Sequence, residues 1–179
     1  MQVSKLLLTH CLTAFLHIMD ITLRKIEPND LPWLYKWEND SASWEAGDTH
    51  NPLSQKDLLD YIQSSTGDIY KDAQLRLIID SDSGTAGCVD IYDFDVHNLK
   101  AAVAIYIDKD MRKQNIAQKA LIKLEEYAFG FLRLRFLYAY VGHKNTASRR
   151  LFTACGYKEI ATLPHWLIND SLSVFVKLP

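Results

Sequence analysis

The segment from Ala101 to about Gly130 constrains the fold more than any other part of the 179-residue chain. It begins with Ala-Ala-Val-Ala-Ile-Tyr-Ile, an apolar run that is typical of a central strand buried on both faces. A charged loop follows at 108–115, and apolar residues then recur at helical spacing. A buried strand, a basic loop and a helix in this order favour binding of a diphosphate, because first-turn N–H groups and the helix dipole attract anions.

The rest of the sequence alternates between strand and helix patterns. Ser54 and Asp57 form a capping-box-like start for one helix, and Gly156 is suited to the C-terminal cap of another. This order predicts a mixed α/β domain without internal repeats. We predict strands at 21–26, 75–79, 85–92, 136–141, 157–162 and 172–178, and further helices at 28–37, from 54 to about 64, and at 145–154.

The first residues of the chain, 1–18, are interpreted separately from a single domain at 19–179. The leucine-rich stretch after Lys5 imitates a signal peptide, but His10 and His17 interrupt it and no small-residue cleavage site follows. A membrane span would need about 20 apolar residues. Met19 lies just before the first strand, so we expect 1–18 to be an upstream extension or a misassigned start. An extra helix or partner-binding segment is the alternative.

Composition excludes several classes of function. The net charge of −2 and pI near 6.3 give no phosphate-seeking surface, so we expect no nucleic-acid partner. Cys11, Cys88 and Cys155 lie far apart and lack metal-ligand spacing, so we expect no metal. This sparse, odd number of cysteines predicts reduced thiols and a cytoplasmic location, and we expect no membrane association.

Two motifs identify a resemblance to a known family. Arg112-Lys-Gln-Asn-Ile-Ala117 resembles the signature of the GNAT superfamily of N-acetyltransferases, Gln/Arg-x-x-Gly-x-Gly/Ala. The stretch from Asn145 to Tyr157 resembles the family's helix that begins Asn-x-x-Ala/Ser and ends in Gly-Phe/Tyr. Asn115 replaces the usual glycine, and asparagine tolerates a positive φ better than most residues. The resemblance covers 21–178 and is nearest the branch of spermidine and ribosomal-protein N-terminal acetyltransferases.

The resemblance implies a GNAT fold, acetyl-CoA as cosubstrate and possible homo-oligomers. The fold is a central mixed, mostly antiparallel sheet of about seven strands flanked by about four helices. The resemblance also implies that Asn145 binds the pantetheine arm and that Arg150, with Arg149, contacts the adenosine 3'-phosphate; a solvated helix face is the alternative for the two arginines. The alternative for Asn145 is a purely structural role as the N-cap of a helix. The remaining implied cofactor contacts are the strand residues Ile105, Tyr106 and Ile107 and the pyrophosphate loop residues Arg112, Lys113, Gln114, Asn115, Ile116 and Ala117.

The acceptor side is less clearly marked in the sequence. Many relatives have a tyrosine general acid at the position of Phe152. Either Tyr106, Tyr157 or water replaces it, or the weakly basic thiolate leaves with little help. We choose Glu45 and Asp93 as acceptor-binding or basic groups, because a carboxylate beside an aromatic ring binds organic cations. Solvated loop acids are the alternative. Three hypotheses stay open: an enzyme acting on a polyamine-like or peptide N-terminal amine, a catalytically weak CoA-binding module, and a non-enzymatic interaction domain.

Overall fold

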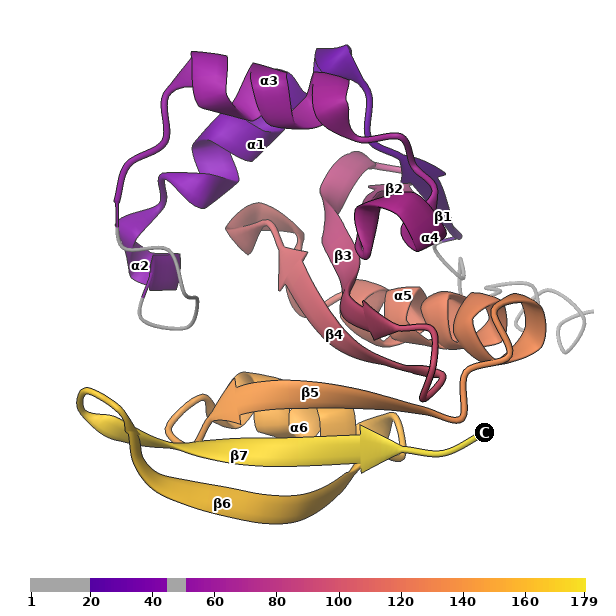
Figure 1. Ribbon diagram of the computed structural model, residues 1–179. Coiled ribbons are helices and arrows are strands. Elements are labelled where there is room, and N and C mark those ends of the chain that lie inside the picture. Colours follow the sequence, from indigo (N-terminus) through magenta and orange to yellow (C-terminus); the bar gives the residue numbers. More distant parts are fainter. Residues whose placement is uncertain (1–19, 45–50) are drawn as a thin grey trace, which may run out of the picture.

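A seven-stranded sheet forms the centre of the molecule (Figure 1). The computed structural model describes residues 20–44 and 51–179, so the segment 1–18 lies outside the described residues. The strands are β1 Ile21–Lys25, β2 Leu75–Ser81, β3 Gly84–Asp95, β4 Lys100–Ile107, β5 Phe136–Gly142, β6 Lys158–Leu167 and β7 Asp170–Lys177. The helices are α1 Leu31–Glu38, α2 Ser41–Trp44, α3 Gln55–Ser64, α4 Ile69–Asp72, α5 Ile116–Glu125 and α6 Thr146–Ala154, with short turns η1 Pro28–Asp30, η2 Lys109–Met111 and η3 Glu126–Phe131.

The sheet is mixed and mostly antiparallel, as the family resemblance implied. Its strand order is β1-β2-β3-β4-β5-β7-β6, and only the β4–β5 pair is parallel. The four expected helices correspond to α1, α3, α5 and α6, which are eight to ten residues long. The structure adds two four-residue helices, α2 and α4.

Helices cover both faces of the sheet and define two apolar clusters (Figure 1). Because side chains alternate along a strand, neighbouring residues of β2 enter different clusters: Ile79 packs with the α5 and α6 side and Ile78 with the α1 and α3 side. Cys88 and Cys155 are buried free thiols, as the sequence predicted, and burial raises the pKa of Cys88 to about 12. Cys11 lies outside the described residues.

Strand β4 differs from the expectation of burial on both faces. Ala101, Ala102 and Val103 are buried, but the second half of the strand, 104–107, is only partly buried. The reason is the position of β5, which pairs with β4 at the beginning of the strand and not at its end. The apolar run therefore reflects a strand whose second half lies beside an opening in the sheet.

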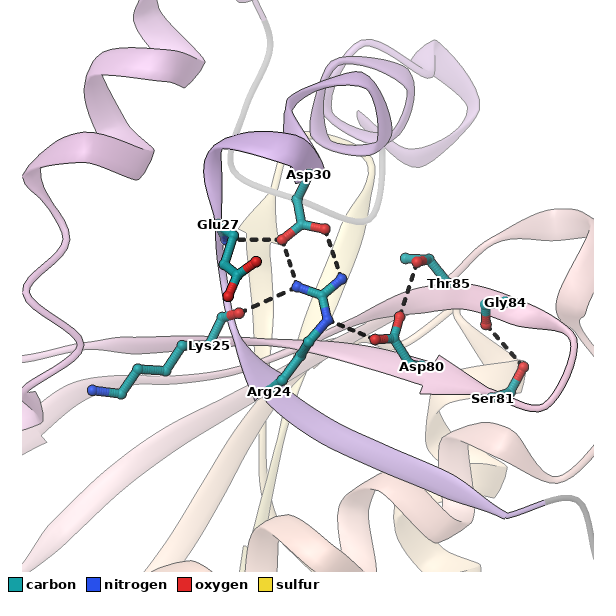
Figure 2. A network of polar contacts seen from close by, with 8 residues as sticks. All are labelled: Arg24, Lys25, Glu27, Asp30, Asp80, Ser81, Gly84 and Thr85. Carbon is teal, nitrogen blue, oxygen red and sulfur yellow. Dashed lines mark hydrogen bonds and ion pairs between the residues drawn. The ribbon is translucent and has the colours of Figure 1, made fainter.

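An arginine connects β1 to the first helical turn and to β2 (Figure 2). Arg24 donates two hydrogen bonds to Asp30, at 2.7 and 2.8 Å, and its Nε donates to Asp80 at 2.6 Å. Asp30 is 3% exposed and also accepts the N–H of Glu27. This fork fixes where the chain leaves the sheet to form α1.

Candidate active site

The parallel strands β4 and β5 separate near the middle of the sheet. Their register consists of three pairs, of which Ala102 and Tyr138 form the last. Beyond this point β4 continues to pair with β3 as far as Ile107, and β5 continues with β7 as far as Gly142. The backbone groups of β4 that face β5 from Val103 onward have no strand partner in the described chain. They are suited to hydrogen-bond an extended ligand in the way that an added strand would.

The charged loop between β4 and α5 turns the chain through two left-handed residues. Lys113 has φ 63° and Asn115 has φ 59°, so asparagine stands at a position where the family's glycine would be unstrained. The Asn115 side chain makes no capping hydrogen bond to α5. The N–H groups at the start of this ten-residue helix, which begins at Ile116, are thus suited to bind an anion.

Substitution of Asn115 tests this backbone conformation. Asn115→Ala is expected to lower the free energy of unfolding by about 1 kcal/mol, because a left-handed conformation is costly for alanine and less so for asparagine. Asn115→Gly is expected to cause no loss. Neither variant removes a capping bond, so the two can be compared directly by thermal unfolding. Equal melting temperatures for the alanine and glycine variants would contradict the assigned conformation.

Most of the predicted cofactor residues lie on one stretch of the chain, which runs from Ile105 at the end of β4 to Ala117 at the start of α5. The Arg112 side chain is exposed, its Nε donates to the carbonyl of Ile107 at 3.0 Å, and its guanidinium carbon lies 5.9 Å from the Tyr106 ring centroid. Lys113 is exposed, whereas Ile116 is 1% exposed and packs in the core. Ile105 and Ile107 also pack against the larger cluster. Ile116 can therefore contribute backbone groups but not its side chain, whereas Ile105 and Ile107 are only partly buried.

The second predicted motif lies at the end of β5. The Asn145 side chain accepts the N–H of Ser148 at 3.0 Å and caps α6, so the N-cap role is present. Arg149 forms an ion pair with Glu159 at 2.9 Å, whereas Arg150 is exposed. The contacts of Asn145 and Arg150 with CoA stay predictions.

Phe152, which stands where the resemblance places a tyrosine general acid, is buried among aromatic rings. The ring is 3% exposed and packs at 5.0 Å from Tyr157 and 6.2 Å from Phe175, centroid to centroid. Burial raises the pKa of Tyr157, which opposes a role as proton donor or acceptor near neutral pH. The Tyr106 ring lies 5.7 Å from Trp37 on the opposite face of the sheet.

The two predicted acceptor residues have different outcomes. Glu45 lies outside the described residues. Asp93 is exposed and has φ 49°, at a register irregularity between Tyr92 and Asp95. A bulge of this kind redirects a side chain and is common beside active sites. Burial and the charge of Asp93 raise the pKa of Tyr138 to about 12.

Sequence reasoning missed a row of aromatic residues on β5, of which Tyr138 is close enough to Asp93 for the charge to raise its pKa. Phe136, Tyr138 and Tyr140 alternate along β5, and the ring of Tyr138 lies 6.3 Å from Phe136 and 5.4 Å from Tyr140. Because Tyr138 pairs with Ala102 where the strands separate, this row of rings reaches the opening between β4 and β5. The alternation was the available signal, but it does not reveal which face of the sheet is open.

The described residues contain neither a candidate metal site nor a helix that could span a membrane. No group of three or more His, Cys, Asp or Glu side chains is placed to hold a metal ion in 20–44 and 51–179. Within the same residues, no helix is both long enough and apolar enough to cross a membrane.

The strand order, the separating parallel pair and the helix start beside it are those of an α/β protein suited to bind an extended ligand that carries an anionic group. A family model described as an acetyltransferase (GNAT) domain matches residues 20–158. The chain therefore belongs to the GNAT acetyltransferase family, and it is an N-acetyltransferase that uses acetyl-CoA as cosubstrate. No curated protein sequence matches it significantly.

Solved structures with the same fold include spermidine N-acetyltransferases of Vibrio cholerae. The complex of this enzyme with CoA and spermine has a TM-score of 0.81 and 19% identity, covering 88% of this chain and 95% of that chain. A dodecameric form in an intermediate state has a TM-score of 0.73 and 21% identity, covering 88% of this chain and 93% of that chain. At these identities the likeness shows the fold.

Proposed function

We propose that the chain transfers the acetyl group of acetyl-CoA to a primary amine, either of a polyamine-like molecule or of a peptide N-terminus. The observation that carries this proposal is the separation of β4 from β5 directly before the basic loop and the start of α5. Family membership supplies the acetyl donor. The similar structure bound to CoA and spermine supports the amine class.

The residues present fit acetyl-CoA, which supplies a thioester carbonyl when it is bound. The backbone of β4 after Ala102 would hold the acetyl and pantetheine groups, and Arg112 with the first N–H groups of α5 would hold the pyrophosphate. Asn145, at the end of β5, would hold the pantetheine arm while it caps α6. The loop from Arg112 to Ala117 carries two cationic side chains, which complements the charge of a diphosphate.

The acceptor side must bind a cation and then release its proton. Asp93 supplies negative charge and the rings of Tyr138 and Tyr140 supply π-faces, a combination that binds organic ammonium groups. In the reaction the bound ammonium first loses one proton to solvent. Its neutral nitrogen then bonds to the acetyl carbon as the carbon–sulfur bond breaks, and the thiolate receives the second proton that the nitrogen loses. Because Phe152 carries no acidic proton, water delivers this proton in the proposed reaction.

Phe152 favours a second candidate, a CoA-binding module with weak catalysis. Its benzyl ring lies at the position where relatives carry the acid, and Asn115 occupies the glycine position of the cofactor loop. The enzyme and the CoA-binding module should both bind acetyl-CoA. Only the enzymatic proposal expects free thiol when an amine is added.

A thiol-release assay with acetyl-CoA and a panel of spermidine, spermine, aminoglycosides and N-terminal peptides tests the function. We expect release with at least one amine. Acetyl-CoA at 100 times its Kd should stabilise the protein by about 2.7 kcal/mol, measured as a rise in melting temperature. Arg112→Ala is expected to weaken cofactor binding about tenfold, because a charge-assisted contact is lost. If acetyl-CoA stabilises the protein but no amine causes thiol release, the result supports the CoA-binding module. If acetyl-CoA neither stabilises the protein nor releases thiol, both candidates are refuted.

The assembly and location of the enzyme belong to the proposal as well. One similar structure is a dodecamer, which supports a homo-oligomer for this chain. The cytoplasmic location expected from the cysteines stays a prediction.

A further inference from the structure

A buried carboxylate connects the cofactor loop to helix α1. Asp108 is the first residue after β4 and is 2% exposed. It accepts hydrogen bonds from two consecutive residues of α1, from Lys36 Nζ at 2.6 Å and from Trp37 Nε1 at 2.8 Å. Its other oxygen accepts the N–H of Asp110 at 3.1 Å and thereby caps the turn η2. We call Lys36, Trp37 and Asp108 the α1 latch.

Both charges of the latch are present at neutral pH. Burial alone would raise the pKa of Asp108, but the hydrogen bonds from Lys36 and Trp37 outweigh it and hold this pKa below its ordinary value. The hydrogen bond to Asp108 raises the pKa of Lys36. An ionised carboxylate in a buried position is costly unless its partners are in place, so the loop is held where α1 presents them.

A second line of contacts joins α1 to the other end of the same turn. The centroid of the Trp37 ring lies 5.7 Å from that of the Tyr106 ring, which precedes η2 in the chain. Arg112 follows η2, and its guanidinium carbon lies 5.9 Å from the centroid of the same Tyr106 ring. Arg112 is also fixed by its bond to the carbonyl of Ile107. Helix α1 thus contacts, directly or through one ring, both residues that flank η2.

We propose that the α1 latch positions the cofactor loop, so that the affinity for acetyl-CoA depends on an ion pair between residues 72 positions apart. Asp108 acts through the backbone of the loop and is a positioning residue. The inference rests on the proposed function, because it assumes that the loop binds the pyrophosphate.

Calorimetric titration of acetyl-CoA tests the latch without knowledge of the acceptor. Asp108→Asn keeps the size of the side chain but removes the charge that binds Lys36, and its one oxygen can accept from Trp37 or from the Asp110 N–H but not from both. We expect its Kd for acetyl-CoA to rise about tenfold, the equivalent of one charge-assisted hydrogen bond. Asp110→Asn is the matched control, because Asp110 lies 3.8 Å from the same lysine and is 76% exposed. Its Kd should stay within about twofold.

Lys36→Met provides a second variant that keeps the buried carboxylate and its tryptophan donor. The Lys36 side chain is 43% exposed, so the variant is expected to fold, and its Kd should rise as for Asp108→Asn. The double variant should bind no more weakly than Asp108→Asn alone, because both substitutions break the same contact. An unchanged Kd in both single variants overturns the latch, as does full additivity in the double variant.

The indole N–H resonance of Trp37 separates positioning from simple stability. This resonance is assigned by its loss in Trp37→Phe. Its chemical shift should change when acetyl-CoA is added to the wild type, and the change should differ in Asp108→Asn. If acetyl-CoA binds but the Trp37 resonance does not shift, the α1 latch is overturned and the proposed function is not. If the wild type does not bind acetyl-CoA, the proposed function fails and the latch fails with it.

Discussion

An Arg24→Met variant is expected to lose about 3 kcal/mol of unfolding free energy, because the buried Asp30 carboxylate is left without its cation. The Arg24 side chain is 33% exposed, so water screens part of the interaction and the lower end of the range for a broken buried pair applies. For a domain of this size the melting temperature should fall by about 6–12 °C at neutral pH, measured by thermal unfolding.

The neighbouring Lys25→Met is the matched control, because Lys25 is exposed and its loss should change stability by less than about 0.5 kcal/mol. Burial alone would raise the pKa of Asp30, but the bonds from Arg24 and from the Glu27 N–H hold it below its ordinary value. The pair therefore stabilises the fold above the unfolded pKa, and this contribution is lost as pH falls through the lower folded pKa. The difference in melting temperature between Arg24→Met and the wild type should therefore become smaller below about pH 4. Equal melting temperatures for the two variants would contradict this role of Asp30.

The strand, loop and helix that carry the predicted cofactor residues could be predicted from the sequence because they are local. The strand 100–107, the loop and α5 follow one another along the chain, and the motif from Arg112 to Ala117 lies within a single turn. Asn115 was predicted to tolerate a positive φ, and the structure places it at 59°. Gly156 was predicted to end a helix, and its φ of 86° after α6 confirms it.

The contacts that position these elements could not be predicted, because they join distant parts of the chain. Asp108 read as one acid in a charged loop, and the sequence gives no sign that it is buried against Lys36 and Trp37. The apolar pattern of β4 was equally ambiguous. A strand covered on both faces and a strand whose second half lies beside an opening have the same composition, and only the β4–β5 register distinguishes them.

The acceptor half was harder still, since its parts come from several elements. Asp93 was chosen from its place after a strand, but its left-handed backbone and its influence on Tyr138 depend on the pairing of three strands. Tyr140 belongs to a row of rings that a period of two reveals, while its exposure on an open face of the sheet does not follow from that period.

Gly87 was not recognised from the sequence, and its replacement is expected to affect both the fold and the cofactor site. A β-carbon at Gly87 would lie 2.1 Å from the carbonyl oxygen of Tyr106, a backbone atom that cannot rotate away. Gly87→Ala should therefore separate β3 from β4 at the Gly87–Ile107 pair and cost about 3 kcal/mol, seen as a lower melting temperature. Gly130→Ala is the control, because a β-carbon there meets nothing within 4 Å. Alanine in that helical turn should be neutral or stabilising by up to about 1 kcal/mol.

The position of Gly87 extends this prediction from stability to binding. The next backbone contact along the pair is the Asp108 N–H, which donates to the carbonyl of Ala86 at 2.8 Å and fixes where the chain leaves β4 for the cofactor loop. A displaced β4 moves Asp108 relative to α1, so the Kd for acetyl-CoA should rise at temperatures where Gly87→Ala is still folded. A variant with a lower melting temperature but wild-type affinity would show that the loop is positioned from α1 and α5 alone, independently of β3. An unchanged melting temperature would show that the close approach of β3 to β4 is not needed for the fold.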